Sequence, residues 1–129
     1  MTNAMRWTNW SGFVAGSPQQ ILTQDSLDGV VEAVKTAPGP LRVVGAGHSF
    51  TPLARTDGTM LSLEKFEGLV SHDEAAAVAR VRAGTRLGSL MQLLQEVGQG
   101  LPNMGDIDKQ AIGGALGTAT HGSGRVLGA

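Results

Sequence analysis

Residues 43–49 read Val-Val-Gly-Ala-Gly-His-Ser and continue a mostly apolar stretch that begins at Leu41. The run predicts a short buried strand over residues 41–44 that leads directly into a glycine loop. Because glycine has no side chain, such a loop exposes successive backbone N–H groups, which can bind phosphate oxygens without lysine or arginine. The stretch therefore predicts a phosphate-binding loop, and a tight turn that binds nothing is the alternative.

The residues after this loop argue against a nicotinamide-binding Rossmann domain. The loop lacks the third glycine of that fingerprint, and the next residues are Phe50-Thr51-Pro52. Proline removes a backbone donor and opposes an immediate helical continuation.

Alternating short strands and helices surround the loop. Strands are predicted over residues 19–24, 41–44, 59–63, 69–72 and 77–83. A first helix is predicted with Asp25 as its N-cap, with one apolar face made of Leu27, Val30, Val31 and Val34, and with its end at Pro38-Gly39-Pro40. A second helix is predicted with Thr85 as its cap, with an apolar face made of Leu87, Leu90, Met91, Leu94 and Val97, and with Gly98 as a left-handed end. This order indicates an α+β or α/β sandwich.

A second glycine-rich region, residues 105–124, combines small side chains with hydroxyl groups. Residues 112–118 carry no bulky polar side chain, so a helix or turn there could bring its backbone against a flat ring or a diphosphate. Thr118, Thr120 and Ser123 could donate hydrogen bonds. A close helix–strand contact made by small residues is the alternative.

Composition limits the possible partners. The chain has 129 residues, enough for one domain, with 10 basic and 11 acidic residues and no cysteine. This balance disfavours nucleic acid, and the lack of cysteine excludes disulfides and zinc–thiolate sites. No segment is long and apolar enough for a membrane span, so we expect a cytoplasmic protein. No metal site is expected, because His48 and His121 lack carboxylates at a matching spacing, and His72 reads as a solvated turn residue.

Taken in order, these motifs resemble the N-terminal part of vanillyl-alcohol-oxidase-type (PCMH-type) FAD-linked oxidases, specifically the aldonolactone (gulono- and arabinono-lactone) and alditol oxidases. The stretches that carry the resemblance are residues 7–10, 25–31, 43–50, 56–58, 101–108 and 114–124. Their common order and spacing make the match specific.

The resemblance implies an α+β, PCMH-type FAD-binding domain of two α+β subdomains with the cofactor between them. The first subdomain would span about residues 14–72 and the second would start at about 73 and continue to 129. Relatives continue well beyond Ala129, so we expect the FAD-binding domain to be incomplete here and the substrate domain and catalytic residues to be absent.

The resemblance also assigns the cofactor contacts. They are Val43, Val44, Gly45, Ala46, Gly47, His48 and Ser49 in the first region, and Asn103, Gly105, Asp108, Gly114, Thr118, Thr120, His121 and Gly122 in the second. His48 matches the histidine that is often bonded covalently to the 8α-methyl carbon of the flavin, and neutral imidazole is a suitable nucleophile. Asn103 is typical of the lactone oxidases, whereas alditol oxidases tend to have serine. Ala119 stands where glycine is frequent, and its methyl group is expected to alter access to one face of the flavin.

The implied activity is oxidation of a CH–OH group in a sugar lactone or polyol by hydride transfer to flavin, with dioxygen or another acceptor reoxidising it. The alternative is a stand-alone, non-catalytic module that binds FAD or another nucleotide.

Overall fold

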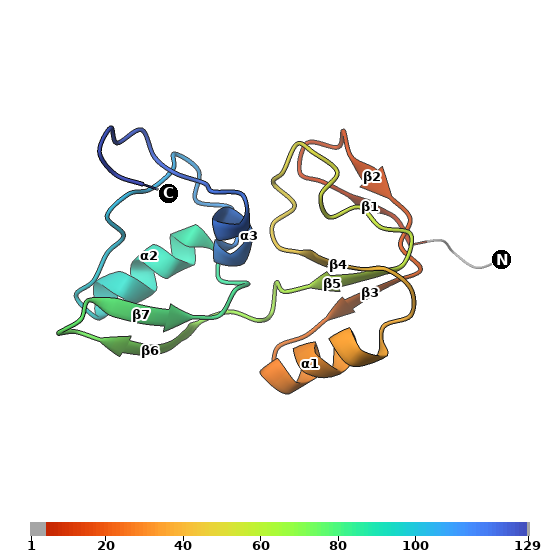
Figure 1. Ribbon diagram of the computed structural model, residues 1–129, viewed down its shortest axis with the longest axis horizontal. Helices are drawn as coiled ribbons and strands as arrows, with labels where there is room; N and C mark the ends of the chain where they lie inside the picture. Colours follow the sequence, from red (N-terminus) through yellow and green to blue (C-terminus); the bar gives the residue numbers. More distant parts are fainter. Residues whose placement is uncertain (1–4, 129) are drawn as a thin grey trace. The chain divides into compact units, whose positions relative to one another are not determined.

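The computed structural model describes residues 5–128, which divide into two compact units. Unit 1 ends at Phe66 and unit 2 begins at Glu67 (Figure 1). The expected boundary near residue 72 falls within strand β6 (Leu69–Asp73) of unit 2. Both units combine helices with strands, which confirms the predicted α+β class.

Unit 1 is built on a parallel sheet of three strands in the order β3-β5-β4. Its strands are β3 (Gln20–Thr23), β4 (Leu41–Val44) and β5 (Thr59–Ser62), which confirms the predicted strands at these places. The prediction that residues 41–44 are buried was wrong in part, because Arg42 and Val43 are exposed. All four residues of the central strand β5 are buried, and Met60 and Leu61 form the core. Two further strands, β1 (Trp7–Thr8) and β2 (Ala15–Gly16), pair antiparallel and are too short to leave a pattern in the sequence.

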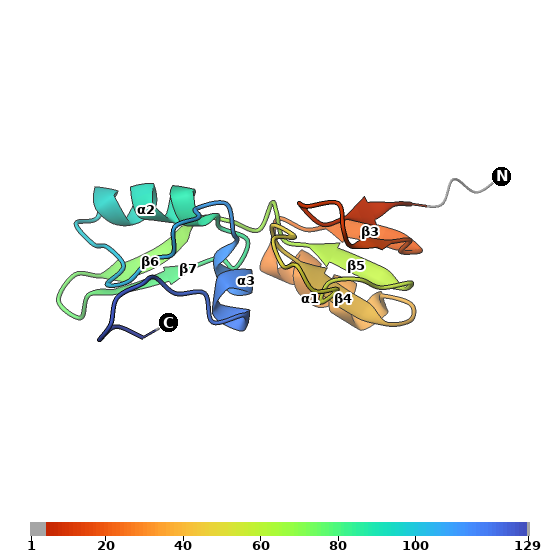
Figure 2. The ribbon, with the colours of Figure 1, turned by 90° about the horizontal axis from the view of Figure 1, so that it is seen from above.

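Helix α1 (Leu27–Thr36) lies along one face of this sheet (Figures 1 and 2). Its N-cap is Ser26, whose hydroxyl accepts a hydrogen bond from the Gly29 N–H at 3.2 Å, so the prediction of Asp25 was wrong by one residue. The predicted apolar face was also wrong in part. The buried face centres on Ala33, while Leu27, Val31 and Val34 are exposed.

Unit 2 consists of a strand pair with two helices. Strands β6 and β7 (Val78–Val81) pair antiparallel, and helix α2 (Leu87–Glu96) packs on them, with helix α3 (Ile112–Gly117) beside it (Figure 2). The core joins Leu87, Leu90 and Leu94 of α2 to Ala115 of α3, with Ala79, Val81 and Ile112 packed against it. Gly98 follows α2 with a φ of 70°, which confirms the predicted left-handed end.

Thr85 does not cap α2 as predicted. The N-cap is Arg86, which makes no side-chain capping hydrogen bond. Thr85 is fully buried instead; its hydroxyl donates to the Arg82 carbonyl at 2.6 Å and accepts from the Gly68 N–H at 2.9 Å. This hydroxyl therefore ties the start of α2 to the beginning of β6.

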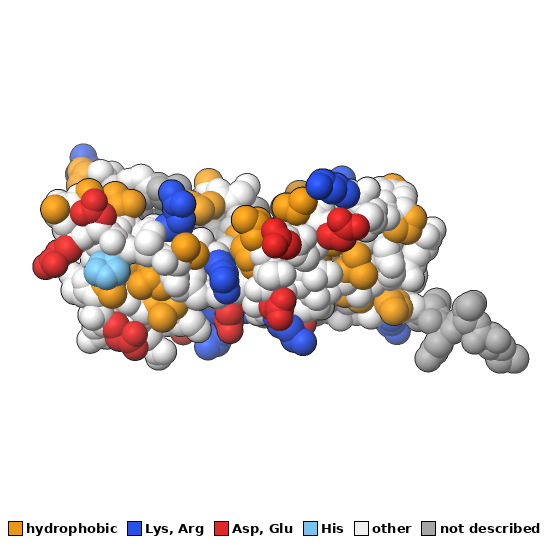
Figure 3. Space-filling view, turned by 90° about the horizontal axis from the view of Figure 1, so that it is seen from below, with side chains coloured by type: hydrophobic (Ala, Val, Ile, Leu, Met, Phe, Trp, Pro, Cys, Tyr) orange, Lys and Arg blue, Asp and Glu red, His pale blue; other side chains and the backbone are white. Residues whose placement is uncertain are grey.

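The surface carries both signs of charge. Figure 3 shows acidic and basic side chains interspersed with hydrophobic ones. No helix among residues 5–128 has the length and apolar character needed to cross a membrane.

Candidate functional site

The predicted phosphate loop starts where strand β4 ends. Residues 45–58 connect the end of β4 to the start of β5 without a helix or strand of their own. Irregular connections of this length in compact units are usually functional, and ligands of parallel sheets bind beyond the carboxyl ends of the strands. The position of the loop therefore favours a binding site. Of the predicted residues before it, Val44 is buried in the core and Val43 is exposed.

A turn at the N-terminus braces this loop through its carbonyl groups. The Trp10 N–H donates to the Gly47 carbonyl at 3.1 Å, and the Asn9 Nδ2 donates to the Ser49 carbonyl at 3.0 Å. Asn9 is only 4% exposed, and its Oδ1 accepts from the Val14 N–H at 3.0 Å. These bonds hold the residues on both sides of His48 in place.

Gly47 is glycine for two local reasons. Its φ is +65°, a conformation that favours glycine, and a Cβ there would lie 3.3 Å from Cζ2 of Trp7.

The N–H groups of the loop remain available. In the part of the chain that the structure describes, none of the backbone N–H groups of residues 45–49 donates a hydrogen bond to another protein group. The five residues are half-buried. A loop whose carbonyls are engaged and whose N–H groups are free suits an anion such as a diphosphate.

The imidazole ring of His48 lies flat against Trp10. The ring centroids are 4.9 Å apart and the planes differ by 2°. Phe50 meets Trp10 edge to face, with centroids 5.4 Å apart. Within residues 5–128 neither ring nitrogen of His48 has a hydrogen-bond partner. One face of the imidazole is thus covered, while the nitrogens at its edge have no protein partner within residues 5–128.

In unit 2, two of the predicted segments lie side by side. Gly122 contacts the carbonyl group of Met104 and the side chain of Asn103, and a Cβ on Gly105 would lie 3.4 Å from Cγ2 of Thr120. The structure thus brings together Asn103, Gly105, Thr120, His121 and Gly122.

Most polar side chains of this region bond within the protein. Asn103 Nδ2 donates to the Gly128 carbonyl at 2.7 Å, and the Thr118 hydroxyl donates to the Gly114 carbonyl at 3.0 Å. The His121 Nδ1 lies 2.7 Å from the Gly122 carbonyl oxygen. Ser123 is exposed. Side-chain contacts with a ligand would require these bonds to change, so the exposed backbone of α3 is the better candidate.

Asp108 stands apart from this group. Its carboxylate lies 3.0 Å from Lys109 Nζ, and its carbonyl accepts from the Gly88 N–H at the start of α2. It therefore stabilises the start of α2, and within residues 5–128 nothing in its surroundings joins it to the other predicted contacts.

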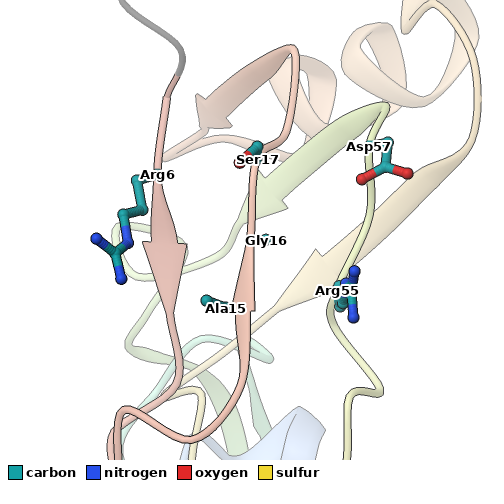
Figure 4. A pocket seen from close by; sticks show the side chains of 6 residues that line it. All are labelled: Arg6, Ala15, Gly16, Ser17, Arg55 and Asp57. Carbon is teal, nitrogen blue, oxygen red and sulfur yellow. The ribbon is translucent and has the colours of Figure 1, made fainter.

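A metal site, His72 and a pocket in unit 1 are weaker candidates for a functional site. Among the described residues no three His, Cys, Asp or Glu side chains are grouped so as to hold a metal ion. His72 is exposed and lies in β6 rather than in a turn. A shallow pocket in unit 1 is lined by Arg6, Ala15, Gly16, Ser17, Arg55 and Asp57, but Arg6 and Arg55 lie on opposite sides of β2 in Figure 4 and do not converge.

The sequence reasoning missed Trp7, Asn9 and Trp10 as parts of the site. Their contacts with the loop join residues about 40 positions apart, which no local pattern reveals. One signal was available: Asn9 lies between Trp7 and Trp10, and a polar side chain that is buried among aromatic residues is usually hydrogen-bonded.

Comparisons with known proteins indicate the family of the chain. Residues 18–128 match the sequence family described as FAD binding domain. The chain is 37% identical over 122 residues to L-gulono-1,4-lactone dehydrogenase of Mycobacterium tuberculosis, with 92% of this chain and 28% of that protein covered. It is 29% identical over 119 residues to alditol oxidase of a Streptomyces species, with 91% and 29% covered.

A solved structure supports the fold. Cholesterol oxidase of B. sterolicum matches with a TM-score of 0.74 at 24% identity, covering 93% of this chain and 24% of that one. The chain therefore spans about a quarter of the length of the proteins that it matches.

Proposed function

The chain belongs to the FAD-binding-domain family, and from this membership we propose that residues 45–49 bind the pyrophosphate of FAD. The free N–H groups of residues 45–49 are the observation that carries the proposal, since they suit a dianionic diphosphate and these five residues include no lysine or arginine. The brace on the loop's carbonyls fixes these donors before the ligand arrives, which lowers the cost of ordering them on binding.

The second region would add contacts from unit 2. Gly114 lies on the exposed side of α3 with nothing near its missing Cβ, so its backbone can be approached closely by a ligand. The other predicted contacts are Asn103, Gly105, Asp108, Thr118, Thr120, His121 and Gly122. Asp108 has the weakest support among them, because its carboxylate pairs with Lys109.

His48 would bind the flavin covalently. A C–N bond would form from an imidazole nitrogen to the 8α-methyl carbon of the flavin. One proton from that methyl group, one proton from the imidazole and two electrons would pass to an acceptor such as dioxygen, which becomes hydrogen peroxide. The free ring nitrogens of His48 support this role, because no protein hydrogen bond has to break before the nitrogen attacks.

We propose that the whole protein oxidises the CH–OH group of a sugar lactone, with a polyol as the second candidate substrate. FAD, when bound, supplies the chemistry by accepting hydride from that carbon and passing electrons to dioxygen or another acceptor. A lactone is favoured because Asn103 matches the lactone oxidases and because identity to the lactone dehydrogenase, 37%, exceeds that to the alditol oxidase, 29%.

Mass spectrometry and absorbance of the protein, expressed with the sequence that flanks this chain in its natural gene, test the proposal. A covalent adduct with the mass of FAD, and yellow colour that stays with the acid-precipitated protein, are expected. His48→Ala should release the flavin on precipitation, whereas His72→Ala, which changes an exposed histidine of β6, should not. Reversible FAD binding by the wild-type protein would overturn the covalent role alone, and failure to bind FAD would overturn the whole proposal.

A further inference from the structure

We propose that Trp10 is a positioning residue that orients the imidazole of His48 for bond formation with the flavin. The inference deepens the proposed function and rests on the covalent role of His48. It concerns a residue outside the glycine loop that reaches the site only through the fold.

One turn fixes the backbone on both sides of His48. Gly47 is held by the Trp10 N–H and Ser49 is held by the Asn9 side chain. Asn9 is in turn locked, because its Oδ1 also accepts from the Val14 N–H and from the Ser11 hydroxyl. The Cα of His48 therefore has little freedom, and the remaining freedom lies in its side-chain torsions.

Trp10 restricts the side-chain torsions of His48. Parallel stacking at 4.9 Å with a 2° angle between planes fixes the plane of the imidazole and covers one of its faces. Phe50 packs edge to face on Trp10 at 5.4 Å, so the indole is itself supported. The same residue thus holds the loop through its N–H group and the reactive ring through its indole.

Stacking on Trp10 leaves the ring nitrogens of His48 uncovered. The lone pair of an imidazole nitrogen lies in the plane of the ring, so a face-covering partner does not block attack along the ring edge. A hydrogen-bonding partner would have occupied a nitrogen, and none is present for His48 among residues 5–128. An aromatic face can therefore orient this ring while the lone pair of its nitrogen stays available to attack.

Orientation of a nucleophile changes the rate of bond formation far more than the affinity of the bound partner. We therefore expect Trp10→Leu to slow covalent attachment about tenfold or more, while reversible FAD affinity and thermal stability change much less. Trp10→Phe keeps a stacking face and should retain most of the rate. Phe13→Leu is the matched control, because Phe13 lies in the same turn, is 89% exposed and makes no ring contact with another residue of the described range 5–128.

The experiment uses protein expressed with its natural flanking sequence and prepared without flavin. FAD is added, and acid-stable flavin is measured over time, with FAD affinity and the thermal midpoint measured on the same samples. A selective loss of rate in Trp10→Leu that Trp10→Phe restores supports the proposal. Unchanged attachment in Trp10→Leu, or a parallel loss of attachment, affinity and stability, overturns it. Wild-type protein that never gains acid-stable flavin overturns it together with the covalent role of His48, whereas the other outcomes leave that role intact.

Discussion

Gly122 packs directly against the carbonyl group of Met104, with no room between them for a Cβ atom. The same missing atom would also overlap the side-chain oxygen of Asn103. Because one of the obstructing atoms belongs to the backbone, a rotamer change cannot remove the overlap. Gly122 is therefore required by the packing of unit 2 itself, whatever ligand the region binds.

Gly122→Ala should destabilise unit 2. Forcing a methyl group into this contact pushes the segment after α3 away from the loop around Met104, and overpacking of this kind costs about 1–3 kcal/mol. Urea unfolding followed by circular dichroism measures the loss. Gly117→Ala is the control, since nothing lies within 4 Å of its Cβ position. Equal unfolding midpoints for Gly122→Ala and the wild type would contradict the close contact.

Gly114→Ala tests whether this glycine is needed for the stability of the fold or for binding a ligand. A Cβ there meets nothing within 4 Å, and alanine favours a helix over glycine by about 1 kcal/mol. The variant should therefore be as stable as the wild type or more stable. If the backbone of α3 approaches the cofactor, the added methyl group should weaken FAD binding by about tenfold, or 1.4 kcal/mol, as measured by fluorescence titration.

Gly113→Ala is the comparison for that variant. Its Cβ would lie 3.1 Å from both the Cβ and the carbonyl oxygen of Ala83, so its effect should fall on stability first. If Gly114→Ala binds FAD with wild-type affinity, α3 does not contact the cofactor through this residue.

The strands and the class of the fold could be predicted from the sequence because their signals are local. Val43 and Val44 lie in an apolar run, and the apolar face of α2 repeats at helical spacing, so β4 and α2 were expected where they are found. The start of α1 was missed by one residue because Asp25 and Ser26 are both good N-caps, and the choice depends on backbone angles that composition does not reveal.

The contacts that shape the candidate site could not be predicted, because they join distant segments. The bond from Asn9 to Ser49 spans 40 residues, and the stacking of Trp10 on His48 depends on the turn that this bond holds. A sequence pattern can indicate that a loop binds phosphate, but it does not identify the side chains that hold the loop.

Thr85→Val should lower the stability of unit 2 without changing the shape of the side chain. The hydroxyl of Thr85 accepts from the Gly68 N–H, and its loss would leave that half-buried donor without its protein partner. A fully buried unsatisfied group costs about 1–3 kcal/mol, so a half-buried one should cost about 1 kcal/mol. The Arg82 carbonyl still accepts a hydrogen bond from the Thr85 N–H. The loss of stability therefore comes from the Gly68 N–H alone.

Chemical denaturation of Thr85→Val and Thr85→Ser distinguishes the hydroxyl from the methyl group. Serine retains the two hydrogen bonds and should lose less stability than valine does. The reverse order would show that packing rather than hydrogen bonding makes this position important.

Ala119→Gly should stabilise the protein, although it removes atoms. Ala119 has a φ of +52°, and left-handed backbone costs a residue with a Cβ about 1–2 kcal/mol, part of which glycine recovers after its greater loss of chain entropy. We expect a gain of about 0.5–1 kcal/mol, measured as a higher denaturation midpoint. This strain gives a physical reason why glycine is frequent at this position in the proteins that the chain resembles.

Ala77 offers the matched test, because it is the other non-glycine residue with positive φ, 51°, in residues 5–128. Ala77→Gly should stabilise by a similar amount at the turn between β6 and β7, far along the chain from any predicted cofactor contact. Ala76→Gly, at a neighbouring residue without positive φ, should instead destabilise slightly. If Ala119→Gly raises FAD affinity while Ala77→Gly does not, the methyl group of Ala119 obstructs the cofactor as well as straining the backbone. If both variants gain only stability, backbone conformation accounts for the whole effect.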